Sequence, residues 1–193
     1  KTVNKRTNSH GAMRNCIEYV LRQDKTSELL TYVTGPYCHD AINYDLVYQT
    51  FLEEKYRKDF RELEVVYIWG ETGVGKTRSV MEKYGYENVF RVTNYDHPFD
   101  GYSGQDVMLF DEFRSSLPLS NMLCYLDGYP LMLPCRYANR VACYTKVYII
   151  SNIPLEKQYP NVQLEELASF EAFKRRLTSV YRMLPTLPNG EPF

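Results

Sequence analysis

The feature of this sequence that most restricts its fold is a glycine-rich run that fits the pattern G-x-x-x-x-G-K-[ST] at every fixed position. The run reads Gly70-Glu71-Thr72-Gly73-Val74-Gly75-Lys76-Thr77. Before it lies an apolar segment, 65–69, that is typical of a buried strand, and after it residues 76–84 lack Pro and Gly and predict a helix. Strand, glycine loop and helix in this order predict a phosphate-binding loop in an α/β domain.

Each residue type in the run suits the binding of phosphate. Glycines allow backbone N–H groups to close around phosphate oxygens, and the start of the helix adds a partial positive charge. We expect Lys76 to reach the β- and γ-phosphates and the Thr77 hydroxyl to ligate Mg²⁺. The alternative is a glycine-rich turn followed by an incidental Lys-Thr pair, which leaves the flanking strand and helix unexplained. The run therefore predicts a nucleotide-binding protein.

Composition limits the classes of protein that remain. A chain of 193 residues, 44% of them hydrophobic, can form one sizeable α/β domain with a small appendage. Its net charge of −1 creates no overall basic field, so any nucleic acid must be held by a local patch. The five cysteines are odd in number and form no C-x-x-C pair, which favours reduced thiols in a cytosolic-type compartment. No apolar run approaches the roughly 20 residues of a membrane span, so we expect no membrane partner.

The remaining segments alternate between helix and strand patterns. Strands are expected at 88–93, 107–110 and 146–150, with a hairpin whose arms are 129–135 and 141–143. Helices are expected at 12–23, 45–61, 119–126 and 165–182, and the proline-rich tail from 185 is expected to be irregular. This pattern predicts a central, mostly parallel sheet preceded by a small helical segment.

Polar residues at two strand ends suggest the chemistry of hydrolysis. Asp111 and Glu112 directly follow the apolar strand 107–110. Asp111 suits coordination of Mg²⁺, directly or through water, and Glu112 suits activation or positioning of the attacking water. Asn152, after the next apolar strand, could hold that water and sense the γ-phosphate. The alternatives are a solvated acidic turn and an ordinary turn Asn before Pro154.

Two basic clusters have both a functional and a structural interpretation. Arg175 and Arg176, on the last expected helix, could act as arginine fingers toward a neighbouring subunit, or could form a solvated helix face. No acidic residue occurs between 128 and 155, and the expected hairpin tip carries Arg136, Tyr137 and Arg140, with Lys146 following. Such a tip could track phosphates and stack on a base of single-stranded nucleic acid, or could be a surface turn with two arginines.

The order of these motifs resembles a superfamily 3 helicase of the AAA+ type. More closely, it resembles the P-loop ATPase domain of rolling-circle replication initiators (Rep proteins) from circular single-stranded DNA viruses and related bacterial plasmids. The resemblance covers roughly residues 40 to 184 and includes the stretch 127–152, which is similar to the family's DNA loop and sensor region. It implies that 70–77 is the Walker A motif, that Asp111 and Glu112 form Walker B, and that Asn152 is the sensor.

The resemblance also implies partners and cofactors. ATP with Mg²⁺ would be the cofactors, and Arg136 and Arg140 would lie on a loop that grips single-stranded DNA. Arg175 or Arg176 would be the finger acting in trans within a homo-oligomeric ring, a hexamer in the family, and 45–61 matches the family's oligomerisation segment. The family often has a Lys or small glycines at the loop tip, where this chain has Arg136, Tyr137 and Ala138.

The N-terminal part resembles the end of a nicking (HUH) nuclease domain. Glu18-Tyr19-Val20-Leu21-Arg22 is similar to the family's catalytic Tyr helix, although plasmid relaxases offer a second match and Tyr19 could equally be a core residue. The three histidines are scattered, and a nickase needs a metal, so we expect no DNA cleavage by this chain. Because the sequence opens at Lys1 rather than Met, we expect it to be a fragment.

These observations give an expected domain plan and function. Residues 1–40 would be a nuclease remnant or linker, 41–62 the oligomerisation segment, 63–184 the ATPase domain and 185–193 a tail. The expected activity is ATP-driven 3′-to-5′ translocation on single-stranded DNA, in the cytoplasm for a bacterial plasmid or in the nucleus for a eukaryotic virus. The alternatives are an RNA helicase of a small RNA virus and an assembly module in which hydrolysis is incidental.

Overall fold

The computed structural model describes residues 44–185, with side chains from Gln49 onward. These residues belong to two parts, divided after Asp59, and each part is described by itself. The expected helix at 12–23, with Tyr19, and the tail beyond Pro185 lie outside the described residues. Within the described range, none of the helices combines the length and apolar character that a membrane crossing requires.

The described section of the first part is one helix, α3 (Tyr44–Tyr56). The sequence predicted a helix over 45–61, so its existence is confirmed but its end is wrong. Lys55 lies in the last turn, where a cation interacts favourably with the helix dipole. The helix cannot reach Arg61, because the Arg61 backbone N–H donates to the Gly128 carbonyl at 2.8 Å instead of to a preceding turn. Its expected role in oligomerisation stays a prediction.

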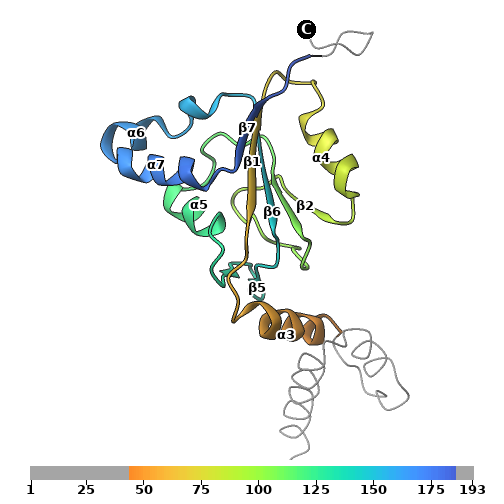
Figure 1. Cartoon of the computed structure of the whole chain (residues 1–193). Helices are drawn as coiled ribbons and strands as arrows, with labels where there is room; N and C mark the ends of the chain where they lie inside the picture. Colours follow the sequence, from red (N-terminus) through yellow and green to blue (C-terminus); the bar gives the residue numbers. More distant parts are fainter. Residues whose placement is uncertain (1–43, 186–193) are drawn as a thin grey trace, which may run out of the picture. The chain divides into compact units, whose positions relative to one another are not determined.

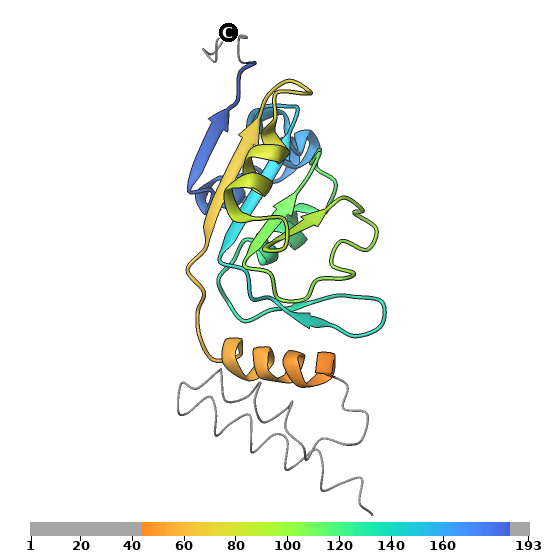
Figure 2. The same ribbon diagram turned by 90° about the vertical axis from the view of Figure 1, so that its right-hand side faces the viewer.

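The second part is built on a five-stranded parallel sheet whose strand order is β2-β3-β6-β1-β7 (Figure 2). The strands are β1 (Glu64–Trp69), β2 (Val89–Val92), β3 (Val107–Phe110), β6 (Lys146–Ser151) and β7 (Ser179–Arg182). Their β-branched and aromatic residues favour the extended backbone. The central strands are continuous apolar runs because both faces of the sheet are covered.

Helices cover the two faces unequally (Figure 1). One face carries α4 (Lys76–Tyr84), and the other carries α5 (Leu119–Tyr125), α6 (Pro160–Glu165) and α7 (Leu167–Arg176). A short 3₁₀ turn, Leu155–Lys157, precedes α6. The remaining element is an antiparallel hairpin of β4 (Met132–Leu133) and β5 (Arg140–Val141), which confirms the predicted hairpin with shorter arms.

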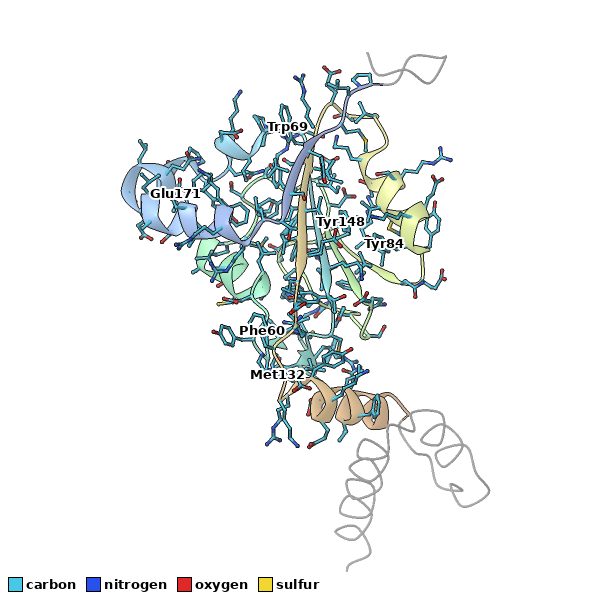
Figure 3. All side chains as sticks on the ribbon, in the orientation of Figure 1. Phe60, Trp69, Tyr84, Met132, Tyr148 and Glu171 are labelled. Carbon is cyan, nitrogen blue, oxygen red and sulfur yellow. The ribbon has the colours of Figure 1, made fainter. Side chains whose placement is uncertain are left out.

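Alternate side chains of the central strands build two separate cores. Tyr67, Phe110 and Ile149 belong to the larger core, which they share with buried residues of α5 and α7. Leu109 and Ile150 face the other way, into the smaller core that includes Val80 of α4. On that side Tyr84 and Tyr148 approach each other, with hydroxyl oxygens 2.7 Å apart (Figure 3). The predicted α/β fold with a mostly parallel sheet is therefore confirmed.

Parallel strands bring chemically important positions to one edge. The glycine loop follows β1, Asp111 follows β3, and Asn152 follows β6, so all three lie at the carboxyl-terminal edge of the sheet. The β4–β5 hairpin lies toward the opposite edge (Figure 1). The fold therefore separates the end that carries the glycine loop from the end that carries the basic hairpin.

The prediction of one helix over 165–182 is wrong. The segment holds the end of α6, the whole of α7, and then β7, which pairs with β1 in register from Val66↔Ser179 to Trp69↔Arg182. The change occurs at Leu177, after a last helical turn rich in cations, and no Gly or Pro marks it. Thr178 begins the pairing, since its N–H donates to the Val65 carbonyl at 2.7 Å and its Oγ1 accepts from the Val65 N–H at 3.0 Å.

A buried amide joins the loop after β3 to the loop after β6. Gln158 is fully buried, and the two hydrogens of its Nε2 are shared among Tyr67 Oη, Ser151 Oγ and the carbonyl of Phe113. Its Oε1 accepts from the Ser115 hydroxyl at 2.8 Å. Such a network stabilises a fold only while every member has a partner.

We expect Gln158→Leu to lower the free energy of unfolding by about 2 kcal/mol, because it leaves the Ser115 hydroxyl without its acceptor and the Phe113 carbonyl with one donor fewer. Chemical denaturation followed by tryptophan fluorescence measures the change. The control is Gln105→Leu, whose contacts with Ser103 are exposed, so its effect should stay under about 0.5 kcal/mol. Equal effects of the two substitutions would contradict the role given to Gln158.

Candidate nucleotide-binding site

The glycine loop has the backbone geometry that its sequence predicted. Gly73 and Gly75 have φ values of 87° and 90°, in the left-handed region that favours glycine. A Cβ atom at either position would meet no other atom within 4 Å, so the open space and the conformation together leave room for a ligand beside the backbone. Gly75 immediately precedes α4, whose first N–H groups have no partner within the helix. This is the geometry of an anion-binding helix start.

Lys76 is buried at the base of this loop. Its ammonium group donates to the carbonyls of Gly70 and Glu71 at 2.8 and 2.6 Å and to Asn152 Oδ1 at 2.9 Å. Burial lowers the pKa of Lys76 below its ordinary value, while the charges of Glu112 and Asp111 oppose that shift. Lys76 therefore connects the glycine loop to the end of β6.

Asp111 connects the loop to the end of β3. Its carboxylate is almost fully buried, and Oδ1 accepts from the Thr77 hydroxyl at 2.7 Å and from the Glu112 backbone N–H at 3.1 Å. The Thr77 contact fixes the distance between the two motifs. Because Thr77 uses its hydrogen for Asp111, the lone pairs of Oγ1 remain for another partner.

Sequence reasoning missed two residues that hold Asp111. Arg91, on β2, donates from Nε to Asp111 Oδ2 at 2.7 Å, and a terminal guanidinium nitrogen forms an ion pair with the same oxygen at 2.5 Å. Tyr95 donates its hydroxyl to the backbone carbonyl of Asp111 at 2.6 Å. Burial raises the pKa of Tyr95, and the charges of Asp111 and Glu112 raise it further, so the phenol stays a donor. The sequence indicated Arg91 only as a single cation within the predicted strand 88–93.

Glu112 and Asn152 face each other across the site. Asn152 Nδ2 donates to Glu112 Oε2 at 2.6 Å, while Asn152 Oδ1 accepts from Lys76. Glu112 has φ of 50°, an unusual value for a residue with a side chain. The next residue, Phe113, is fixed by its N–H to the Ile150 carbonyl at 2.8 Å. This turn directs the Glu112 carboxylate to the amide of Asn152.

The oxygen atoms of Thr77 and Asp111 suit Mg²⁺ only when phosphate oxygens and water complete the coordination of the ion. The Thr77 hydroxyl and the Asp111 carboxylate supply oxygen, which Mg²⁺ prefers, together with substrate phosphates and water. Among the described residues, no group of three or more His, Cys, Asp or Glu side chains could hold a metal ion alone. The structure thus brings together the loop, Asp111, Glu112 and Asn152, and their roles in hydrolysis stay predictions.

The predicted nucleic-acid residues lie elsewhere and do not form one cluster. Tyr137 at the hairpin tip is 94% exposed, and the neighbouring Arg136 is ion-paired through Nε with Asp100. Arg140 begins the second arm of the hairpin. Lys146 is the first residue of β6 and binds Asp106 at 3.0 Å. It therefore lies at the amino-terminal end of a sheet strand and not at the hairpin tip.

Arg175 and Arg176 differ in their surroundings, although both lie in the last turn of α7. Arg176 donates to the Ala172 carbonyl at 3.0 Å and to Asp127 at 2.8 Å. Arg175 is exposed. The structure therefore gives Arg176 a place in the domain's own packing and presents Arg175 to solvent.

Comparison with protein families identifies one match. Residues 66–152 fit the family model described as RNA helicase. This range begins within β1 and ends at Asn152, so it includes the glycine loop and both acidic residues.

Curated relatives come from bird viruses. The replication-associated protein of canary circovirus is 36% identical over 102 residues, which are 53% of this chain and 34% of that protein. The replication-associated protein of beak and feather disease virus is 34% identical over 102 residues, which are again 53% of this chain and 34% of that protein. This chain thus spans about a third of the length of these relatives. Among solved structures, the yeast Hsp104–ADP complex aligns with a TM-score of 0.43 and 17% identity, over 72% of this chain and 26% of that one.

We expect Lys76→Met to weaken nucleotide binding roughly 10- to 100-fold, because hydrogen bonds to a charged group contribute about 1.5–3 kcal/mol. Titration with a fluorescent ADP analogue measures the affinity. Lys83→Met is the matched control, since Lys83 lies on the same helix but contacts Tyr84 and Tyr148. If both substitutions weakened binding equally, Lys76 would have no special place in the site.

Proposed function

We propose that this chain is the motor part of a rolling-circle replication initiator, because residues 66–152 match the RNA helicase family model and the relatives are circovirus-type replication-associated proteins. The motor hydrolyses ATP to move along single-stranded DNA. The observation that carries the proposal is the 2.7 Å contact between Thr77 and Asp111, which joins the phosphate loop to the acidic pair. The relatives' description as replication-associated proteins supports the setting.

The loop and Lys76 bind the polyphosphate. Backbone N–H groups at the start of α4 and the Lys76 ammonium would face the phosphate oxygens, and Thr77 with Asp111 would hold the divalent ion. When bound, Mg²⁺ would neutralise charge on the transferring phosphoryl group. The protein's own contribution is to position these groups before the reaction.

Glu112 and Asn152 act on the attacking water. Glu112 accepts or orients its proton, and Asn152 holds the Glu112 carboxylate and contacts Lys76. Because one amide touches both residues, a shift of Lys76 toward phosphate changes the position of Glu112. This arrangement links binding of the γ-phosphate to the alignment of the base.

The basic hairpin contacts the nucleic acid. Its exposed Tyr137 offers a surface on which a base can stack, and Arg136 and Arg140 offer positive charge for the backbone. The Arg136–Asp100 ion pair opposes this contact, since a phosphate must compete with a carboxylate for the guanidinium group. Lys146, held by Asp106, contributes less.

Hydrolysis between subunits of a ring requires a finger from a neighbour. Arg175 suits this role better than Arg176, because Arg175 is exposed while Arg176 is bound to Asp127 and Ala172. The helical segment around α3 is the proposed contact that builds the ring, with a hexamer as the expected assembly.

A second candidate substrate is RNA, which the description of the matched family favours. Tyr137, Arg136 and Arg140 of the hairpin suit a single strand of either kind. Competition between DNA and RNA strands of one sequence for the hairpin decides between them. Tighter binding of RNA, with stronger stimulation of ATP hydrolysis by RNA, would replace the DNA proposal.

The central test is Glu112→Gln. We expect this variant to bind ATP as the unaltered chain does but to hydrolyse it roughly 100- to 10,000-fold more slowly, the usual range for loss of a general base. Phosphate release in the presence of single-stranded DNA measures the rate, and Glu87→Gln, an exposed acid, is the control. Full DNA-dependent function in Glu112→Gln would favour an assembly module in which hydrolysis is incidental.

The hairpin proposal has its own test. We expect Asp100→Asn to strengthen binding of single-stranded DNA about twofold to fivefold, since an exposed ion pair is worth about 0.2–1 kcal/mol and its loss frees Arg136. Arg136→Gln should weaken binding and reduce the slope of log affinity against log salt by about one. Fluorescence anisotropy measures both, with Arg78→Gln as the control on α4. Weaker binding by Asp100→Asn would contradict the proposed competition.

A further inference from the structure

Arg91 binds one oxygen of Asp111 from the neighbouring strand. β2 and β3 are parallel, with Arg91 opposite Leu109, so the guanidinium group reaches forward to the residue that follows β3. Both of its contacts, from Nε and from a terminal nitrogen, go to Oδ2. The planar guanidinium group makes this two-point contact, which an ammonium group cannot reproduce.

Both carboxylate oxygens of Asp111 therefore have partners within the protein. An ionised carboxylate has about four lone-pair sites on its two oxygens. Oδ1 accepts from the Thr77 hydroxyl and from the Glu112 N–H, and Oδ2 accepts from Arg91 Nε and forms an ion pair with its terminal nitrogen. A metal ion could bind this carboxylate directly only by displacing one of these donors.

The donors are not equally easy to displace. Thr77 and Glu112 are fixed by α4 and by the turn after β3, and Tyr95 holds the Asp111 carbonyl from a third direction. Arg91 has a long side chain on the edge strand β2, and that side chain is 49% exposed. The contact that decides whether Oδ2 can reach a metal is thus the one made by Arg91.

We propose that Arg91 is a positioning residue that restricts Asp111 to the outer coordination sphere of the divalent ion. By occupying Oδ2, it leaves the Thr77 hydroxyl as the protein group that touches the ion, with Asp111 acting through Thr77 and water. This inference rests on the proposed function, because it specifies how the ion of that site is held. The sequence left open whether Asp111 coordinates Mg²⁺ directly or through water, and this proposal selects coordination through water.

Binding of Mn²⁺ without nucleotide, followed by electron paramagnetic resonance, tests the proposal without relying on activity. Removing Arg91 frees Oδ2 for a metal and removes a competing cation, so Arg91→Gln should bind Mn²⁺ at least tenfold more tightly than the unaltered chain. The double variant Arg91→Gln with Asp111→Asn should return to the original affinity, which identifies the carboxylate as the new ligand. Arg182→Gln is the control for charge, since Arg182 lies at the same sheet edge over Trp69.

Hydrolysis gives a second readout. Arg91→Gln should lower kcat for ATP at least tenfold with KM changed less than threefold, because an ion bound directly by Asp111 would neutralise the phosphoryl charge less well. Arg91→Lys keeps the charge but loses the two-point contact. Its Mn²⁺ affinity should therefore lie between that of the unaltered chain and that of Arg91→Gln. If Arg91→Gln does not fold, Arg91→Lys provides the test. An Mn²⁺ affinity of Arg91→Lys equal to that of the unaltered chain would then overturn the proposal.

Failure of the inference and failure of the proposed function are distinguishable. Mn²⁺ affinity in folded Arg91→Gln that is unchanged or weaker than in the unaltered chain overturns the role of Arg91, whatever the ATPase activity. An unaltered chain that neither binds nor hydrolyses ATP overturns the proposed function, while the Mn²⁺ measurements still report on Arg91 and Asp111.

Discussion

A carboxylate buried at the end of a sheet must be supplied with donors, and this requirement at Asp111 organises the end of the domain that carries the glycine loop. The donors come from three separate segments: Thr77 from the start of α4, Arg91 from β2, and the Glu112 N–H from the turn itself. An unpaired buried charge costs far more than any of these contacts gains. Loop, edge strand and turn are therefore held in one relative position by a single side chain.

The connection between β2 and β3 links that carboxylate to the hairpin. It begins near Tyr95, which binds the Asp111 carbonyl, and it ends at Asp106, which binds Lys146. Between them Asp100 pairs with Arg136, and the Tyr102 hydroxyl accepts from the Cys143 N–H at 3.1 Å. A segment that the sequence marked only as a loop thus contacts both ends of the domain.

The sequence was sufficient to predict candidate site residues wherever they form a pattern with their neighbours in the chain. The glycine run, the acidic pair after an apolar strand, and Asn152 after another were all visible as local patterns, and the parallel sheet brings them to one edge. Arg91 could not be assigned, because its partner is set by the order of the strands, which no local pattern gives. The strand β7 was missed for a related reason: Thr178 is extended because it bonds to Val65, far away in the sequence.

The same dependence on distant partners gives Lys76 a second role beside its proposed contact with phosphate. Its three N–H groups already have acceptors, two of them backbone carbonyls of the loop and one the side chain of Asn152. A phosphate oxygen that binds Lys76 must replace one of them, and Asn152 is the acceptor that can move, because the carbonyls belong to the loop backbone. Asn152 in turn holds Glu112 at 2.6 Å. Competition for one ammonium group is therefore enough to couple the loop to the proposed base, without any change in the sheet between them.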